Sequence, residues 1–338
     1  MMKRKPTIDD VAREAGVTKG TVSHVFNGHR PISETTRQRV IDTAAKLGWV
    51  PNSSARALAA KRCNAIGIVL ARDPQVLHSD MFFSVFLSGV ESVLVKSEVA
   101  LVLQMVSDRQ AEARAYRSMY QGRVDGFIVL DLTYSDWRID LLRELEASVV
   151  LVQSSNDNQA PDFSSVWVDD RAPMRTLVRT LKTRGHHRVA HISGPLRYVH
   201  SNERVISYLD ETGTDEFLRE GNFTAESGLK LTRELLSLEQ PPTAIIYSND
   251  VMAIAGLSYA QSIGMSIPED LSIAGFDDDP ISVHLNPPMT SVSTNAYERG
   301  QLAAEQLLAV IQGGTPQSIE VQRPKVRWRK STEGTMLD

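Results

Sequence analysis

Apolar residues near the N-terminus recur at the spacing of short amphipathic helices. Residues 8–15 place apolar side chains at positions i, i+3, i+4 and i+7, and residues 19–26 and 34–47 also carry one apolar face each. A hydroxyl side chain that can cap a helix precedes each segment: Thr7, Thr18 and Ser33. We therefore predict three helices, with a tight turn at Gly16 and Val17 between the first two.

Beyond residue 64 the pattern changes to short apolar runs that alternate with helical segments. Residues 65–70 are apolar throughout, as in a strand that is buried on both faces of a parallel sheet. Further strands are expected at 101–103, 126–130, 149–152, 189–192, 244–246 and 271–274. Helices are expected at 82–96, 109–120, 141–145, 171–184, 227–238, 251–263 and 296–311. Repeated strand–helix units predict an α/β body of two lobes with doubly wound parallel sheets, whose ligands bind at the carboxyl ends of the strands.

Charge separates the two regions. Residues 1–62 hold twelve Lys and Arg against five Asp and Glu, although the whole chain of 338 residues has a net charge of −4. A basic head on an acidic body is typical of a nucleic-acid-binding module, with a solvated basic surface as the alternative. The single cysteine, Cys63, excludes an internal disulfide, and no apolar run is long enough for a membrane span. Without an apolar segment behind the charged N-terminus we expect a cytoplasmic protein and no membrane partner.

The head has the chemistry of a helix-turn-helix. Its second helix is polar on the outer face and narrow enough for the major groove. The hydroxyls of Thr18, Thr21 and Ser23 suit phosphate contacts, whereas Lys19 and His24 are expected to share base recognition. The alternative is a three-helix bundle that contacts protein.

The run TIDDVAREAGVTKGTVSHVFNG, followed by SETTRQRVIDTAAKLGWVPNSSARALAAKR, resembles the DNA-binding head of the lactose repressor / galactose repressor (LacI/GalR) family. The resemblance implies an all-α helix-turn-helix domain over 1–50 and a hinge helix within 51–63. It further implies DNA contacts at positions that match the family pattern: Thr7, Asn27, Asn52, Ala55 and Leu58. His24 and Gly20 depart from the pattern, and Gly20 offers no side chain to a base.

Leu58 is the large apolar residue of the hinge segment. By resemblance it matches the leucine that wedges into a base step in the minor groove, where unstacking bends the duplex. The alternative is that Leu58 packs on the body. Cys63, at the end of this segment, is interpreted as a linker residue.

The body resembles the family's periplasmic-binding-protein-like effector domain. The matching landmarks include residues 82–83, 124–126, 168–170, 193–195, 249–250, 275–278 and 329–332. We expect one ligand-binding and dimerisation domain over 64–332, with a first lobe at about 64–162 and 293–322 and a second at about 163–292 and 323–332. Between Arg204 and Gly221 the chain is shorter than the family pattern, which leaves the first helix of the second lobe unassigned.

The resemblance also implies a site for a small-molecule effector. Arg204, Asn249 and Asp277 would bind hydroxyl groups, and Phe83 and Phe223 would stack on an apolar face, which together fit a sugar. Four of them have a plainer alternative: a helix cap or turn for Asp277, a surface helix position for Arg204, a core position for Phe83, and for Asn249 a helix cap, which is compatible with ligand binding.

Catalytic and metal sites find no support in the sequence. Asp277–Asp279 lack a supporting ligand cluster, and His187 and His191 lack the glutamate of the zinc motif. We expect neither an enzyme nor a cofactor. The leading hypothesis is a transcriptional regulator, in particular a repressor, that binds a pseudo-palindromic operator in double-stranded DNA as a homodimer under control of a small molecule. The alternatives are a transport-type sugar-binding protein and a sugar-processing enzyme.

Overall fold

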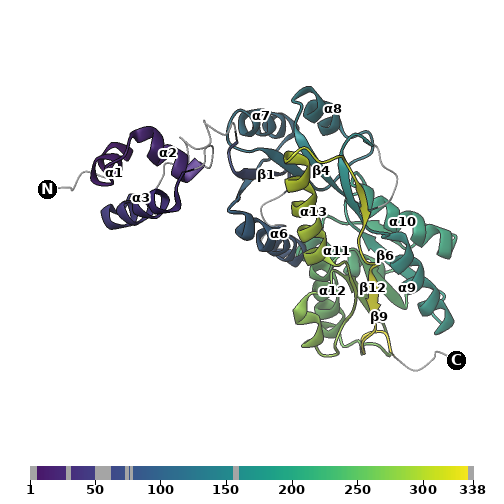
Figure 1. Ribbon diagram of the computed structural model, residues 1–338. Coiled ribbons are helices and arrows are strands. Elements are labelled where there is room, and N and C mark those ends of the chain that lie inside the picture. Colours follow the sequence, from purple (N-terminus) through teal and green to yellow (C-terminus); the bar gives the residue numbers. More distant parts are fainter. Residues whose placement is uncertain are drawn as a thin grey trace. The chain divides into compact units, whose positions relative to one another are not determined.

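The computed structural model describes residues 6–27, 32–49, 62–72, 76, 79–154 and 160–333. The chain divides into two compact units, Met1–Asn64 and Ala65–Asp338. Figure 1 labels helices and strands of both units. No helix among the described residues is both long and apolar enough to cross a membrane.

The head unit contains the three predicted helices, α1 (Ile8–Glu14), α2 (Lys19–Asn27) and α3 (Glu34–Leu47). Thr7 is the N-cap of α1, and its backbone N–H donates to the Asp10 carboxylate at 2.9 Å. Gly48 ends α3 in the left-handed conformation at a φ of 65°, which glycine adopts without steric cost. The structure therefore confirms the helix-turn-helix prediction, which was based on local sequence signals.

One apolar core holds the three helices together. Val11, Val22 and Val40 are fully buried, one from each helix. The rings of Phe26 and Trp49 meet edge to face at 5.3 Å between centroids and cover one side of that core. Burial of one apolar stripe per helix leaves the opposite faces to solvent.

The body contains two six-stranded sheets, each flanked by helices. The first has the order β11-β5-β4-β3-β1-β2 and the second β12-β10-β9-β8-β6-β7. Neighbouring strands are parallel except for the antiparallel pair β10–β12. The first lobe comprises β1 (Ala65–Leu70), β2 (Ala100–Met105), β3 (Gly126–Val129), β4 (Ser148–Gln153), β5 (Ser164–Trp167), β11 (Ser318–Glu320), α6 (Met81–Leu94), η1 (Val95–Ser97), α7 (Arg109–Tyr120), α8 (Trp137–Glu144) and α13 (Ala296–Ile311).

The second lobe comprises β6 (Val189–Ser193), β7 (Leu218–Glu220), β8 (Ala244–Tyr247), β9 (Ser272–Phe276), β10 (Thr290–Ser293), β12 (Lys325–Arg327), α9 (Arg171–Thr183), α10 (Val199–Thr212), α11 (Ala225–Leu236), α12 (Asp250–Ser262) and η2 (Pro280–Val283). The chain passes between the lobes after β5, before α13 and between β11 and β12. Both sheets are doubly wound, as the alternating pattern predicted. The carboxyl ends of their central strands bear the candidate site.

Two expectations about the body need correction. A lobe boundary at 162/163 would place β5 in the second lobe, whereas β5 hydrogen-bonds to β4 and β11 in the first sheet. The short segment between Arg204 and Gly221 still contains most of a complete helix, α10. Its buried face includes the polar Glu203 and Arg204, so its apolar pattern is weak, while the buried Tyr208 donates to the Val189 carbonyl at 2.9 Å and fixes α10 to β6.

Candidate functional site

The exposed face of α2 is organised by hydroxyl groups. Thr18 Oγ1 accepts a hydrogen bond from the Thr21 backbone N–H at 3.1 Å, which caps α2, and the two hydroxyls lie 2.9 Å apart. A second function for Thr18 as a phosphate contact is compatible with capping, because a hydroxyl oxygen accepts more than one hydrogen bond. Figure 1 shows α1, α2 and α3 as one small bundle.

Lys19 is held in an ion pair that the sequence did not reveal. Its ammonium lies 3.1 Å from Asp9 Oδ2, and both side chains are more than half exposed. Such a pair contributes at most about 1 kcal/mol, so Lys19 is available to an acceptor on DNA. His24 and Ser23 are half-buried on the same helix. The side chain of Asn27 and the hinge positions Asn52, Ala55 and Leu58 lie outside the described residues.

A buried pocket lies between the two lobes of the body. Four of the five predicted effector residues line it: Phe83, Arg204, Phe223 and Asp277. The other lining residues are Arg72, Asp80, Phe82, Leu130, Asp131, Val152, Ser154, Asp170, His200, Ser248 and Arg299. The first lobe contributes residues beyond the ends of β1, β3 and β4, and the second lobe contributes residues beyond β8 and β9. The pocket therefore stands where parallel sheets commonly bind ligands.

Arg204 is anchored within the pocket wall. Its guanidinium donates to the Ser248 carbonyl at 2.8 Å and to Asp170 Oδ1 at 3.1 Å, and it lies 4.2 Å from the centre of the Phe276 ring. Its Nε–H is buried without a partner among the described residues. The residue is 5% exposed. This excludes a surface position for Arg204 and leaves its Nε–H to donate to a bound molecule.

Asn249 does not line the pocket. Its Oδ1 accepts from the Met252 N–H at 3.0 Å and caps α12, which was the plainer alternative. Its Nδ2 donates to the Phe223 carbonyl at 3.0 Å and to Asp80 Oδ2 at 3.2 Å. Asp80 belongs to the first lobe, so Asn249 joins the two lobes behind the pocket.

An arginine that the sequence analysis missed occupies the aromatic part of the pocket. Arg72 donates to both carboxylate oxygens of Asp131, each at 2.6 Å. Its guanidinium carbon lies 5.0 Å from the Phe83 ring, 4.8 Å from the Tyr198 ring and 4.7 Å from the Phe223 ring. Cation–π contacts to rings of both lobes therefore surround Arg72.

The ring of Phe223 is fixed from two sides. Phe223 itself has a φ of 68°, and its ring stacks with His200 at 5.8 Å between centroids. On the other side, a Cβ added to Gly194 would lie 1.9 Å from Phe223 Cζ. Glycine at this position is thus required by the close approach of the ring.

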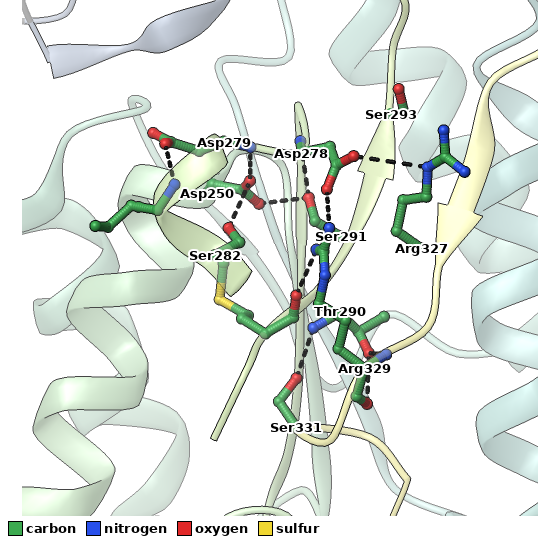
Figure 2. Close-up of polar contacts among 12 residues, drawn as sticks. Asp250, Asp278, Asp279, Ser282, Thr290, Ser291, Ser293, Arg327, Arg329 and Ser331 are labelled. Carbon is green, nitrogen blue, oxygen red and sulfur yellow. Dashed lines mark hydrogen bonds and ion pairs between the residues drawn. The ribbon is translucent and has the colours of Figure 1, made fainter. Parts of the chain in front are cut away.

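The residues that follow Asp277 are tied to the surrounding elements, and Figure 2 shows the polar contacts of Asp278 and Asp279. Asp250, at the start of α12, accepts from Ser291 Oγ and from the Asp279 N–H, both at 2.6 Å. Asp278 accepts from Arg329 of the C-terminal segment at 2.5 Å. Asp277 has a φ of 100°, an unfavourable conformation for a non-glycine residue that these neighbours maintain.

Burial and neighbouring charges shift the pKa values of the ionisable side chains in the pocket. Burial and the nearby Asp80 raise the pKa of Asp277 to about 7, although Arg204 acts in the opposite direction. Burial alone would raise the pKa of Asp131, but the charge and hydrogen bonds of Arg72 hold it below its ordinary value. Burial, opposed only in part by Asp131, lowers the pKa of His200 to about 3, so its imidazole is neutral.

The lobes are also joined beside the pocket. Thr133 and Tyr198 form an antiparallel bridge, and the Val199 N–H donates to the Leu132 carbonyl at 2.9 Å. The Tyr134 hydroxyl donates to Glu203 at 3.1 Å. These bonds and the contacts of Arg72 define a closed arrangement of the two lobes.

Comparisons with known proteins give a matching family model for each of the two units. Residues 7–52 match the model of bacterial regulatory proteins of the lacI family, and residues 178–332 match the periplasmic binding protein-like domain. The chain is 32% identical to catabolite control protein A of Priestia megaterium, over 97% of this chain and 99% of that protein. The chain belongs to the lacI family of bacterial regulatory proteins. It is 31% identical to the transcriptional regulator CelR of Thermobifida fusca, over 94% of this chain and 96% of that one.

Solved structures of LacI-family proteins share the fold. The lac repressor dimer bound to operator and an anti-inducer has a TM-score of 0.84 at 27% identity, over 97% of this chain and 99% of the other. The CelR–cellobiose complex has a TM-score of 0.74 at 28% identity, over 96% of this chain and 99% of the CelR chain. CelR is named as a transcriptional regulator, and PurR of Aliivibrio salmonicida, which is 29% identical over 96% of this chain and 98% of that protein, is named as a transcriptional repressor. This protein is accordingly a DNA-binding transcriptional regulator.

Some pocket residues of this LacI-family regulator carried a usable sequence signal. Arg72 and Asp131 each stand two residues beyond the observed ends of β1 and β3, two strands that the sequence predicted, where ligand-facing residues of a parallel sheet are expected. His200 and Arg299 lie within helices, and nothing in their spacing marks them. Among the described residues no group of three His, Cys, Asp or Glu side chains is arranged to hold a metal ion.

Proposed function

We propose that this regulator represses transcription as a homodimer on a pseudo-palindromic operator in the cytoplasm, and that a sugar bound between the lobes of the body controls it. The observation that carries the proposal is the buried pocket, in which arginines, carboxylates and aromatic rings from both lobes converge. Such a donor and acceptor set matches a polyol with an apolar face. The CelR relative, solved with cellobiose, supports a sugar.

On the operator, α2 would enter the major groove. Thr7, Thr18, Thr21 and Ser23 would contact phosphates, and Lys19 and His24 would contact base edges. Asn27 would lie at the end of this surface. The hinge residues Asn52, Ala55 and Leu58 would bind the minor groove, with Leu58 as the wedge.

In the pocket, Arg204, Asp277, Phe83 and Phe223 would contact the effector, and Asn249 would position Phe223 through its carbonyl. The effector acts only by its different affinity for the open and closed arrangements of the lobes. Because the pocket residues come from both lobes, a bound molecule changes the relative free energy of these arrangements and thereby operator affinity.

Asp277→Ala tests the proposal. Operator DNA is first selected from a random pool by the full-length protein, and binding is then measured by fluorescence anisotropy with and without a panel of sugars. Asp277→Ala should abolish the sugar response and leave operator affinity within a few-fold. Asp140→Ala, at a side chain that is 88% exposed, is the control and should respond as wild type does.

Equal sugar affinity of wild type and Asp277→Ala in calorimetry would contradict the effector site. If the protein selects no DNA sequence, the result would contradict the proposal that it represses transcription at an operator, and it would favour a transport-type sugar-binding protein.

A further inference from the structure

The pocket holds three arginines, and two of them are neutralised by carboxylates of the protein. Arg72 is paired with Asp131 at 2.6 Å, and Arg204 with Asp170 at 3.1 Å. The third, Arg299, has no carboxylate among the described residues within the 4.0 Å of an ion pair. It is therefore the one lining arginine that lacks an ionic partner in the described part of the chain.

Arg299 is nevertheless buried. The residue is 6% exposed, and its Nε–H has no partner among the described residues. The hydrogen bond that its Nη2 donates to the Gln153 carbonyl is long, at 3.5 Å. Burial lowers the pKa of Arg299, which the charge of Asp170 offsets only in part. Buried charges in proteins are otherwise paired and hydrogen-bonded.

The position of Arg299 is fixed by the packing of α13 on α6. A Cβ added to Gly89 would lie 2.1 Å from the Tyr297 carbonyl oxygen, and one added to Gly300 would lie 2.1 Å from the Phe86 carbonyl oxygen. This close helix contact places the Arg299 guanidinium 5.3 Å from the Phe82 ring at the pocket wall.

The remaining carboxylates of the pocket have other partners. Asp277 accepts from Thr294 Oγ1 at 3.2 Å, and Asp80 accepts from the Phe82 N–H at 3.0 Å and from Asn249 at 3.2 Å. Burial raises the pKa of both groups. A neutral sugar would leave the charge of Arg299 without a direct counter-ion, whereas a ligand carboxylate or phosphate would supply one, with two oxygens that the planar guanidinium fork can bind.

We propose that Arg299, together with the free Nε–H of Arg204 in the same pocket, binds an anionic group of the effector, so that the ligand is an acidic sugar derivative that carries a carboxylate or a phosphate. The proposal rests on the proposed function insofar as the pocket is the effector site. It narrows the ligand class from sugars in general to anionic ones.

The test uses small anions that enter the pocket whatever the stereochemistry of the effector. Full-length protein with 15N-labelled arginine is titrated at constant ionic strength with acetate, inorganic phosphate and the neutral acetamide, and the Nε–H resonances are followed. Acetate or phosphate should shift the Arg299 resonance saturably, and acetamide should not. A response to acetate alone indicates a carboxylate ligand, and a response to phosphate alone indicates a phosphorylated one.

Matched variants locate the effect. Arg299→Met approximately keeps the length of the side chain but removes its charge, so it should weaken anion binding at least tenfold. Binding to this variant is followed by the shift of the Arg204 Nε–H resonance and by the rise in thermal midpoint. Arg323→Met, at an arginine that is 79% exposed, should leave it unchanged. Circular dichroism verifies that each variant folds. Arg299→Lys keeps the charge without the planar fork and should retain weaker binding.

Two results would overturn the inference: no saturable response to either anion, or equal anion affinity in wild type and Arg299→Met. The measurement uses no DNA, so its failure can be distinguished from a failure of the proposed function. Operator binding with no response at Arg299 removes only this inference, and anion binding without operator selection removes only the regulatory proposal.

Discussion

Arg72 and Asp131 are joined across the carboxyl ends of β1 and β3 by two hydrogen bonds of 2.6 Å, and both side chains are largely buried. Because the Arg72 guanidinium also contacts Tyr198 and Phe223 of the second lobe, this one side chain stabilises the closed arrangement of the lobes.

The first prediction concerns this pair. Arg72→Met leaves the Asp131 carboxylate buried without its cation, so we expect a loss of about 3–5 kcal/mol in the free energy of unfolding of the body. The double variant Arg72→Met/Asp131→Asn has no unpaired charge and should recover much of that loss. Urea unfolding followed by circular dichroism measures both. A double variant no more stable than Arg72→Met would show that the pair is not the cause.

The second prediction concerns pH. The pKa of Asp277 is raised in the folded protein to about 7 from its ordinary value of 3.8. Between these values the folded state binds more protons than the unfolded state, so this group's contribution to stability is complete below pH 3.8 and is lost as pH rises through about 7. Each pH unit in that window costs at most about 1.4 kcal/mol.

Asp277→Asn removes this dependence. The ligand-free wild type should therefore lose stability relative to Asp277→Asn when the pH is raised from 5 to 8, as measured by the urea midpoint. Asp140→Asn, at an exposed carboxylate, serves as the control and should follow wild type. Parallel pH profiles of wild type and Asp277→Asn would show that Asp277 titrates normally.

The third prediction concerns Gly194. Gly194→Ala places a Cβ within 1.9 Å of Phe223 Cζ, so the ring must shift. We expect a loss of about 1–3 kcal/mol in stability from this overpacking, together with weaker effector binding. In the Phe223→Ala background the same substitution should cost far less, because the clashing ring is absent. An equal cost in both backgrounds would place the strain elsewhere.

The fourth prediction concerns base recognition. Lys19→Ala should relax the base preference at one base pair per half-site, at a cost of about 1–3 kcal/mol there, because a lysine donates to the guanine acceptors of the major groove. Binding-site selection with the variant measures this.

Lys46→Ala is a matched control, since Lys46 forms an exposed ion pair with Glu14 at the same 3.1 Å as Lys19 with Asp9. It should keep the wild-type base preference. An unchanged preference for both Lys19→Ala and His24→Ala would contradict recognition of bases by α2.

The sequence by itself determined the elements whose signals are local. The caps at Thr7 and Ser33, the glycine at 48 and the apolar spacing specify the three head helices, and 34–47 was predicted to the residue. The same holds for β1, α7 and α13, which are strongly apolar or clearly periodic. Motif resemblance also selected four residues that line the pocket, Phe83, Arg204, Phe223 and Asp277, although of these only Asp277 stands just beyond a predicted strand.

Only the tertiary structure decided what these segments meet. The polar buried face of α10 hid that helix, and the membership of β5 in the first sheet depends on hydrogen bonds to β4 and β11. Arg72 and Arg299 stand more than two hundred residues apart and line the same pocket. Both side chains are buried, but Arg72 has a carboxylate partner and Arg299 has none among the described residues. This difference depends on how the two sheets and the α6–α13 contact bring distant side chains together, which no local pattern encodes.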